Sequence, residues 1–308
     1  MSLLVVGTVA FDDIETPFGR AEKVVGGAAT YIALAASYFT KRIQIVSIVG
    51  DDFPVADLDD LRARGVDLAG LQVKQGEKSF FWAGKYHYNM NDRDTLDTQL
   101  NVLADFDPVL PADYQTSEYV MLGNLTPAVQ MRVIDQMKTR PKLIALDTMN
   151  FWMNTALEEL LEVIARIDML IINDEEAKQL SGEHSLVKAA AVIHKMGPRF
   201  LVIKKGEHGA LLFADNQVFF APALPLAEVY DPTGAGDTFA GGFMGYIAAT
   251  HDLSFDNMKR AVVYGSALAS FCVEKFSTER LKELDDDQIA ERMFRFVQLV
   301  NFDAKLSV

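Results

Sequence analysis

Cysteine is nearly absent from this sequence, since Cys272 is the only one in 308 residues. A single thiol excludes an internal disulfide and any metal cluster built from several cysteines, and it fits a reducing compartment. Cys272 lies in an apolar stretch of helical period. We therefore expect it to be a buried packing residue rather than a catalytic nucleophile.

Positive charge is also scarce, with 29 Lys and Arg against 43 Asp and Glu, which gives a formal net charge of −14. This excess of acid opposes electrostatic binding to nucleic acid or to anionic lipid. No apolar run approaches the roughly 20 residues of a membrane-spanning helix, and the first residues, MSLLVVGTVAFDD, carry no basic leader. We expect a cytoplasmic protein that binds neither nucleic acid nor membranes and holds any anionic ligand by local features.

The sequence does contain a repeated alternation of short apolar runs with longer segments of helical period. This alternation is typical of an α/β fold with a mostly parallel sheet covered by helices on both faces. The apolar runs are rich in Val, Ile and Leu, as buried parallel strands are. The predicted strands are 3–7, 43–49, 119–122, 143–147, 169–172 and 200–204. The predicted helices are 30–39, 55–64, 127–138, 155–167, 186–196, 235–249 and 256–273, with Asn173 and Ser185 as candidate caps.

Residues 11–25 and 71–100 break this alternation, because both carry aromatic, Thr and polar residues in strand-like alternation with no helix between. We predict that the two stretches form one small antiparallel sheet. Such a sheet stands off the main body and acts as a lid over the ends of the parallel strands; an extra edge of the main sheet is the alternative. Exposed apolar residues such as Phe80 and Trp82 would favour a homodimer through the lid.

Glycines gather at the start of a predicted helix, in the segment Asp231-Pro-Thr-Gly-Ala-Gly-Asp237. Gly234 and Gly236 permit positive φ and leave room for another molecule to approach the backbone. The free N–H groups of the first turn, at Ala235 and Gly236, combine with the positive end of the helix dipole. Together they predict an anion hole able to stabilise a phosphoryl group in transfer.

Asp237 lies in this first turn, where it is placed to accept the proton of an attacking hydroxyl group. The helix dipole favours the ionised carboxylate that a general base needs, and phosphoryl transfer requires mainly alignment and charge stabilisation. By spacing alone, a glycine-rich helix start with Asp237 as a capping acid fits as well. The segment is neither a Walker loop, which needs Gly-Lys-Ser, nor a dinucleotide fingerprint, because Phe239 stands where the third glycine belongs.

The segment closely resembles the second signature of the ribokinase family, the phosphofructokinase-B type sugar and nucleoside kinases. The resemblance extends along the chain to further elements in the same order: Gly7 with Asp12, the pair Gly26 and Gly27, Asn173 to Glu176, and Gly206 with Gly209. It implies one three-layer α/β/α ribokinase-like domain over residues 1–308, with a small β-sheet lid. It also implies ATP and Mg²⁺, and in many members a dimer through the lids.

The resemblance implies roles in acceptor binding near the start of the chain. In the family, an Asp five residues after the glycine of the first strand binds substrate hydroxyls, and here Gly7 assigns that role to Asp12. Gly26 and Gly27 would bring backbone amides close to the substrate because they lack side chains. A plain helix-entry turn is the competing interpretation of the glycine pair.

Two further elements are implied to hold nucleotide and metal. Asn173-Asp-Glu-Glu176 matches an Asn-x-x-Glu element whose polar groups hold Mg²⁺ and phosphate, largely through waters, and Mg²⁺ prefers such oxygen ligands. Without the resemblance this segment is an ordinary capped helix start. Lys204-Lys-Gly206-Glu-His-Gly209 matches a turn that usually begins with Thr and contacts the nucleotide. Lys204, replacing that Thr, would reach phosphate as a point charge or simply end the strand.

Two departures from the family pattern leave the acceptor open. Tyr31 stands where sugar kinases commonly have Asn, and Asp147-Thr-Met-Asn150-Phe-Trp152 lacks the Arg of the usual Asp-x-Asn-x-Arg. Aromatic side chains there suit an acceptor without phosphate or acid, because aromatic faces stack on sugars and on bases. A core role for Tyr31 and Trp152 is an equal alternative, while Asn150 is a candidate to position the acceptor.

We therefore predict an ATP-dependent phosphotransferase that transfers the γ-phosphate to a hydroxyl, best a hydroxymethyl, of a small sugar, with a nucleoside as the alternative acceptor. Asp237 takes the proton, and the amides of Ala235 and Gly236 stabilise the phosphoryl group. A monovalent cation near Asp231 is a further candidate. Two other classes are weaker: a non-catalytic sugar- or nucleotide-binding regulator, which the intact glycine segment opposes, and a dinucleotide oxidoreductase, which lacks the glycine spacing.

Overall fold

The computed structural model describes residues 2–301, whose strands form one sheet of nine strands and one of four. The large sheet contains β1 (Leu3–Val6), β4 (Ile43–Gly50), β5 (Val66–Lys74), β8 (Tyr119–Leu122), β9 (Leu143–Asp147), β10 (Met169–Asn173), β11 (Phe200–Lys204), β12 (Ala210–Ala214) and β13 (Gln217–Ala221). The small sheet contains β2 (Ala10–Thr16), β3 (Gly19–Gly26), β6 (Phe81–Tyr86) and β7 (Arg93–Gln99).

The large sheet has the order β13-β12-β11-β10-β9-β8-β1-β4-β5. Every pair from β11 to β5 is parallel, while β12 and β13 add antiparallel strands at one edge. All the parallel strands predicted from apolar runs are present in it. These strands carry long apolar runs because both of their faces are covered.

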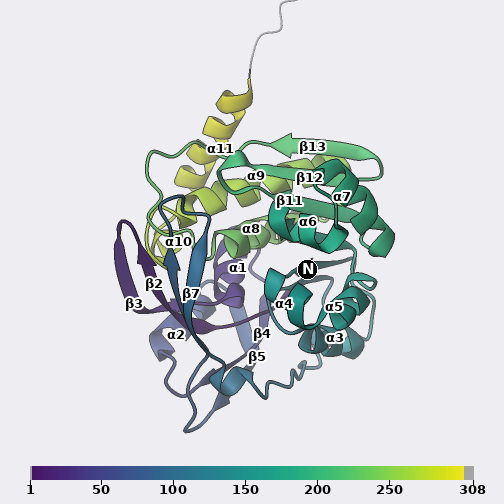
Figure 1. Cartoon of the computed structure of the whole chain (residues 1–308). Helices are drawn as coiled ribbons and strands as arrows, with labels where there is room; N and C mark the ends of the chain where they lie inside the picture. The colour runs from purple at the N-terminus through teal and green to yellow at the C-terminus, as the bar shows by residue number, and fades with distance from the viewer. Residues whose placement is uncertain (1, 302–308) are drawn as a thin grey trace, which may run out of the picture.

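Helices cover the large sheet on both faces (Figure 1). The helices are α1 (Ala28–Ala36), α2 (Val55–Ala63), α3 (Pro127–Gln136), α4 (Asn150–Thr155), α5 (Leu157–Ile164), α6 (Asp174–Ser181), α7 (Leu186–Ile193), α8 (Ala235–Thr250), α9 (Phe255–Cys272), α10 (Glu279–Lys282) and α11 (Asp286–Val300). Short 3-10 helices occur at η1 (Asn101–Leu103), η2 (Tyr114–Thr116), η3 (His194–Met196) and η4 (Gly206–His208). All the predicted helices are present, with ends shifted by a few residues.

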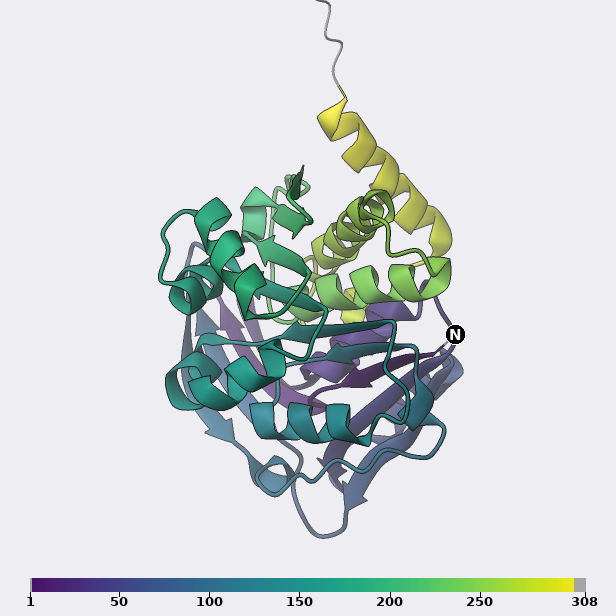
Figure 2. The same cartoon turned by 90° about the vertical axis from the view of Figure 1, so that its right-hand side faces the viewer.

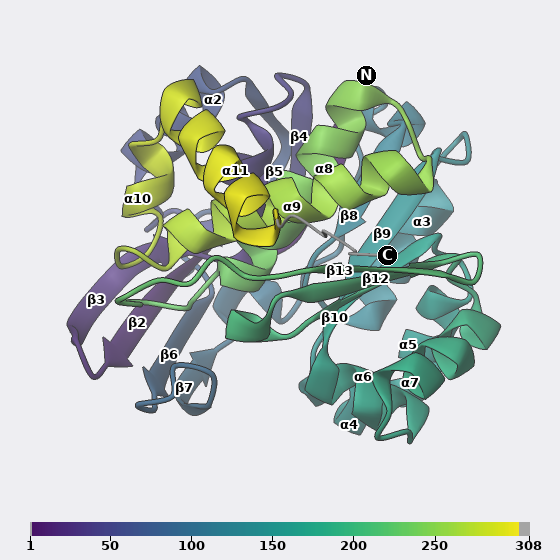
Figure 3. The same cartoon turned by 90° about the horizontal axis from the view of Figure 1, so that it is seen from above.

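Two apolar cores lie on the two faces of the large sheet. One joins α1, α8 and α9 to alternate residues of the strands, and the other joins α3, α5 and α7 to the intervening residues. Figure 3 shows α8 and α9 on one side of the sheet and α5, α6 and α7 on the other. The predicted three-layer α/β/α arrangement is therefore confirmed, and α11 extends from the body in Figure 2.

The small sheet joins the two stretches that were predicted to combine, in the order β3-β2-β6-β7. The outer pairs are antiparallel, but β2 and β6 run parallel. The sequence did not indicate this parallel pairing, because alternation within a strand does not reveal the direction of its neighbour. Residues 71–74 also differ from expectation, since they end β5 in the large sheet. There β5 continues the parallel order beside β4, with Val66 and Leu68 in the core.

Cys272 is buried at 1% exposure, as expected of a packing residue. Among residues 2–301, no helix has both the length and the apolar character that crossing a membrane requires.

Candidate active site

Gly234 adopts a conformation that only glycine takes readily, with φ 74° and ψ 0°, and it is the N-cap residue of α8. A Cβ atom built on Gly234 would lie 2.4 Å from Cζ of Tyr31. The Tyr31 ring therefore packs directly against this glycine and supports the turn. Both the backbone angle and the close packing require that position 234 has no side chain.

The first turn of α8 offers two unpaired backbone donors. The Ala235 N–H donates to the carbonyl of Pro232 at 3.2 Å, whereas the amides of Gly236 and Asp237 have no partner within residues 2–301. The pair of free amides therefore differs from the prediction in one member. Asp237 takes the place of Ala235, whose amide already donates within a turn. Gly236 and Asp237 supply the free N–H groups at the positive end of the helix.

Asp237 is a buried carboxyl whose pKa is raised to about 7. Burial is the main cause, the negative charge of Asp147 adds to it, and the cations Lys204 and Arg93 offset it in part. The expectation that the helix dipole would keep Asp237 ionised therefore missed the larger effect of desolvation. A pKa near neutrality suits a group that accepts a proton in a reaction and releases it afterwards.

Lys204 lies between a carboxylate and the start of α8. Its Nζ is 3.2 Å from Oδ2 of Asp147, and a Cβ atom built on Gly236 would lie 3.0 Å from the same Nζ. Burial would lower the pKa of Lys204, but the carboxylates of Asp147, Glu176 and Asp237 raise it above its usual value. The ammonium group is therefore charged beside the free amides, where an anion would bind.

Asp12 and the glycine pair lie together, as their predicted shared role requires. Asp12 is 5% exposed, and a Cβ atom on Gly26 would lie 1.9 Å from its Oδ2, so only glycine leaves room for the carboxyl group. Gly27 has φ 92°. Burial, with the charges of Asp231 and Asp237, raises the pKa of Asp12 to about 8. The charges of Asp12 and Asp237 thus interact across one site.

The structure does not bring all predicted acceptor residues together. Tyr31 is 1% exposed and lies beneath Gly234, so its ring has no face free for stacking. The Asn150 amide donates to Oε1 of Gln179 at 2.6 Å, which directs it to α6. Trp152 donates through Nε1 to Asn124. For Tyr31 the packing interpretation accounts for its position, while a contact between Asn150 and an acceptor stays a prediction.

Asn173 and Glu176 form a reciprocal capping box at the start of α6. The Glu176 N–H donates to Oδ1 of Asn173, and the Asn173 N–H donates to Oε2 of Glu176, each at 2.8 Å. Burial, with the charge of Asp147, raises the pKa of Glu176 to about 7. Residues 2–301 contain no group of three or more His, Cys, Asp or Glu side chains that could hold a metal. The side-chain oxygens of Asn173 and Glu176 suit a metal ion that is held mainly by phosphates and waters, as Mg²⁺ commonly is.

The turn after β11 is closed by glycines at positive φ, 53° at Gly206 and 86° at Gly209. The Lys205 N–H donates to the carbonyl of Gly209 at 2.8 Å. A Cβ atom on Gly206 would lie 2.8 Å from Oδ1 of Asn91, which belongs to the small sheet's β6–β7 turn. The turn therefore lies against the small sheet.

The small sheet contributes residues that sequence reasoning missed. The Thr233 hydroxyl donates to Oη of Tyr86 at 3.2 Å, and Asn91 and Arg93 also approach the site. No sequence signal identified them, because they lie in a region recognised only as a small sheet. Their proximity to the glycine turns results from tertiary packing.

Asp231 is fixed by two backbone amides rather than left free. Its Oδ1 accepts from Thr233 N–H and its Oδ2 from Ser277 N–H, each at 2.8 Å. With 1% exposure, the carboxyl joins the glycine segment to the turn after α9. A monovalent cation beside it would have to use neighbouring oxygen atoms, and this ion stays a prediction.

Comparison with known proteins assigns this arrangement to a family. The sequence profile described as pfkB family carbohydrate kinase matches residues 4–284. A cytidine kinase of Thermococcus kodakarensis is 28% identical over 250 residues, covering 79% of this chain and 87% of that protein. The nucleoside kinase structure of Methanocaldococcus jannaschii, described as an archaeal member of the ribokinase family, superposes with a TM-score of 0.75 at 20% identity, covering 96% and 99% of the chains. A putative ribokinase II of E. coli in complex with ATP and Mg²⁺ gives a TM-score of 0.74 at 20% identity, covering 97% and 99%.

Proposed function

The chain belongs to the pfkB family of carbohydrate kinases, and we propose that it transfers the γ-phosphoryl group of ATP to a hydroxymethyl group of a nucleoside. One observation carries this proposal. Asp237, with a pKa raised to about 7, lies in a helix start whose free amides adjoin the charged Lys204. A base beside a cationic anion site is the equipment that phosphoryl transfer to a hydroxyl group needs.

In this proposal Asp12 positions the acceptor and Asp237 activates it. The acceptor hydroxyl gives its proton to the Asp237 carboxylate while its oxygen forms a bond to the γ-phosphorus. The bond from that phosphorus to the β,γ-bridging oxygen breaks, and ADP leaves with the electron pair. Gly26 leaves room for the Asp12 carboxyl group and Gly27 leaves room for the neighbouring backbone at Thr8, so the glycine pair lets Asp12 lie where it would meet the acceptor.

The phosphoryl group meets three positive or donor groups in this proposal. The Gly236 and Asp237 amides donate to its oxygens, and Lys204 neutralises part of its charge. Magnesium bound to the ATP phosphates would supply further charge neutralisation, and Asn173 and Glu176 would hold it through waters. The turn at Gly206 and Gly209 would contact the nucleotide.

The acceptor class is proposed from two observations. The cytidine kinase and the archaeal nucleoside kinase cover most of this chain, and both act on nucleosides by name. Trp82 is half-buried on the strand that also carries Tyr86, and its indole lies over Gly84, where a Cβ atom would come within 2.1 Å. It shares the sheet face of Asp12, its register partner on β2. A free sugar is the second candidate, favoured by the hydroxyl-binding chemistry of Asp12.

A phosphorylation assay with ATP and Mg²⁺ tests the proposal directly. The purified protein is incubated with cytidine, uridine, adenosine, guanosine, ribose and fructose, and ADP release and phosphorylated product are both measured. We expect at least one nucleoside to give kcat/KM about tenfold or more above every free sugar. A preference for a sugar would replace the acceptor class, whereas no product with any acceptor would overturn the kinase proposal.

Four further features belong to the proposal. The small sheet acts as a lid over the acceptor. The hydrogen bond from the Thr233 hydroxyl to Tyr86, which joins the small sheet to the glycine segment, supports this role. The protein works in the cytoplasm, where ATP is available. A monovalent cation near Asp231 assists the anion site. Two copies pair through the exposed edge of β7, all of whose residues are exposed.

A further inference from the structure

The β6–β7 hairpin contacts both glycine turns of the site. Tyr86, at the end of β6, accepts a hydrogen bond from the Thr233 hydroxyl at 3.2 Å. Asn91, in the turn, lies so close to Gly206 that a Cβ atom there would come within 2.8 Å of its Oδ1. The hairpin thus reaches from the start of α8 to the turn after β11. A side chain at the start of β7 that projects from the same sheet face as Tyr86 therefore lies above the centre of the site.

Arg93 is that side chain. It begins β7 and is the direct register partner of Tyr86 in the antiparallel pair. Directly opposed residues in such a pair project from the same face of the sheet. Because Tyr86 contacts Thr233 in the glycine segment, Arg93 projects toward the site as well. Its positive charge acts on Asp237 and on Glu176, whose pKa values it lowers.

The charge of the site calls for such a group. Four carboxyl groups, of Asp12, Asp147, Glu176 and Asp237, act on one another there, and Lys204 is paired with Asp147. Arg93 is exposed, and within residues 2–301 its guanidinium has neither a hydrogen bond nor an ion pair. A nucleotide triphosphate would bring several further negative charges. An unpaired guanidinium is well suited to them, because it binds phosphate through two parallel hydrogen bonds and is always charged.

We propose that Arg93 binds the phosphate groups of the nucleotide from the small sheet and neutralises charge on the phosphoryl group during transfer. This inference rests on the proposed kinase function. It gives the small sheet a part in the chemistry beyond covering the acceptor. The alternative is that Arg93 is a charged residue that keeps an exposed edge strand from pairing with other chains.

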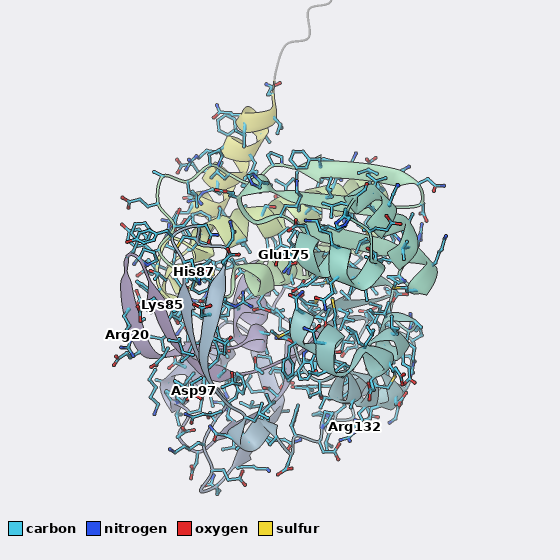
Figure 4. All side chains as sticks on the ribbon, in the orientation of Figure 1. Arg20, Lys85, His87, Asp97, Arg132 and Glu175 are labelled. Atoms are coloured by element: carbon cyan, nitrogen blue, oxygen red, sulfur yellow. The ribbon has the colours of Figure 1, made fainter. Side chains whose placement is uncertain are left out.

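The chain offers a matched control in Lys85, labelled with His87 on the small sheet in Figure 4. Lys85 immediately precedes Tyr86, so it projects from the opposite face of the sheet. There its Nζ pairs with Oε1 of Glu15 at 2.6 Å. Arg93→Ala and Lys85→Ala each remove one exposed cation from the same hairpin, but only the first removes a cation from the face that carries Tyr86.

The decisive experiment compares Arg93→Ala, Arg93→Lys and Lys85→Ala with the wild-type protein. For Arg93→Ala we expect kcat/KM for ATP to fall about 10² to 10³-fold, with partial recovery in Arg93→Lys. Lys85→Ala keeps the wild-type rate. The affinity for the acceptor without nucleotide, measured by calorimetry, stays unchanged in Arg93→Ala. Equal rates for Arg93→Ala and Lys85→Ala would overturn the proposal while leaving the kinase function intact.

A binding measurement separates this inference from the proposed function. The affinities of the wild-type protein and of Arg93→Ala for AMP and for a non-hydrolysable ATP analogue are compared by calorimetry. We expect Arg93→Ala to weaken binding of the triphosphate analogue about tenfold or more and to leave AMP binding unchanged. If the wild-type protein phosphorylates no acceptor, this comparison still decides whether Arg93 binds phosphate. An equal loss of affinity for both nucleotides, or no loss for either, would overturn the inference that Arg93 binds phosphate.

Discussion

Two carboxyl groups of the site differ in surroundings although both are aspartates. Asp237 has the Lys204 and Arg93 charges to offset burial, and its pKa is about 7. The pKa of Asp12 is raised to about 8 by burial and by the negative charges of Asp231 and Asp237. In the proposed mechanism, a neutral Asp12 donates a hydrogen bond to an acceptor oxygen while Asp237 accepts a proton. This division of roles follows from the positions of two cations, and both are supplied by distant parts of the chain.

The pH dependence of turnover should report Asp237. The base is active when ionised and its pKa is raised to about 7 by burial and by Asp147, against Lys204 and Arg93. We therefore expect kcat/KM to rise about tenfold per pH unit below pH 7, to be highest between pH 7 and 8, and to fall above pH 8 as Asp12 loses its proton. The measurement is a rate profile between pH 5 and 9, about two units either side of that pKa.

Asp237→Asn is the control for this profile. It should reduce turnover about 10² to 10⁴-fold and remove the acid limb, while calorimetry shows nearly unchanged nucleotide affinity. A variant with near-normal turnover, or with the same acid limb, would contradict the role of Asp237 as general base.

Gly234→Ala should destabilise the protein more than a glycine substitution at the same backbone angles elsewhere. Gly182 has φ 71° and open space around a Cβ atom, whereas a Cβ atom on Gly234 collides with Tyr31. Gly182→Ala should lower the free energy of unfolding by about 1 kcal/mol from the backbone strain. Gly234→Ala should lose about 1 to 3 kcal/mol more from overpacking, measured by urea unfolding. Equal losses would show that the Tyr31 ring moves away without resistance.

At the scale of single elements, α6 and α11 begin in the same way. Each has a capping box, Asn173 with Glu176 in α6 and Asp285 with Gln288 in α11. The box in α6 lies beside the acidic centre of the site, with Asp147 acting on Glu176. A comparison of variants at the two helix starts therefore distinguishes the effect of losing a cap from an effect on metal and phosphate binding.

Asn173→Ala and Asp285→Ala should each lower the free energy of unfolding by about 1 kcal/mol, because each loses a cap. Only Asn173→Ala should also weaken activity at limiting Mg²⁺, by about 10 to 100-fold. Urea unfolding gives the first quantity, and initial rates over a Mg²⁺ titration give the second. If both variants keep the wild-type Mg²⁺ dependence, Asn173 is a helix cap only.

At the scale of the whole molecule, the free edge of the small sheet bears on assembly. Every residue of β7 is exposed, and Leu96 and Leu100 are 59% and 50% exposed. The aromatic residues Phe80 and Trp82, which suggested a dimer from sequence, are half-buried. The exposed β7 edge, rather than those rings, is therefore the surface that favours pairing.

We expect the wild-type protein to be a dimer at micromolar concentration and Leu96→Lys to be a monomer. Val187 on α7 is 64% exposed, so Val187→Lys is a control of similar exposure outside the small sheet. Light scattering after size-exclusion chromatography gives the mass of each variant. A monomeric wild-type protein, or a dimeric Leu96→Lys, would contradict pairing through β7.

The sequence by itself determined the order of strands and helices and the local chemistry of the site. Buried parallel strands are continuous apolar runs, so their positions could be read directly. The glycine segment could be read because Gly234 lies at positive φ, a local backbone conformation that favours glycine. Asp12, Gly26 and Gly27 were likewise recognised, and the structure brings them together.

Only the tertiary structure decided which distant groups share the site and how their charges balance. The raised pKa of Asp237 depends on burial and on Asp147, Lys204 and Arg93, which come from three separate segments. The tertiary structure also decided three local features. These are the hydrogen bond from the Ala235 amide to the Pro232 carbonyl, the packing of Tyr31 beneath Gly234, and the parallel pairing of β2 with β6. Desolvation and Coulomb interactions act through space, so their values depend on distances that chain order does not specify.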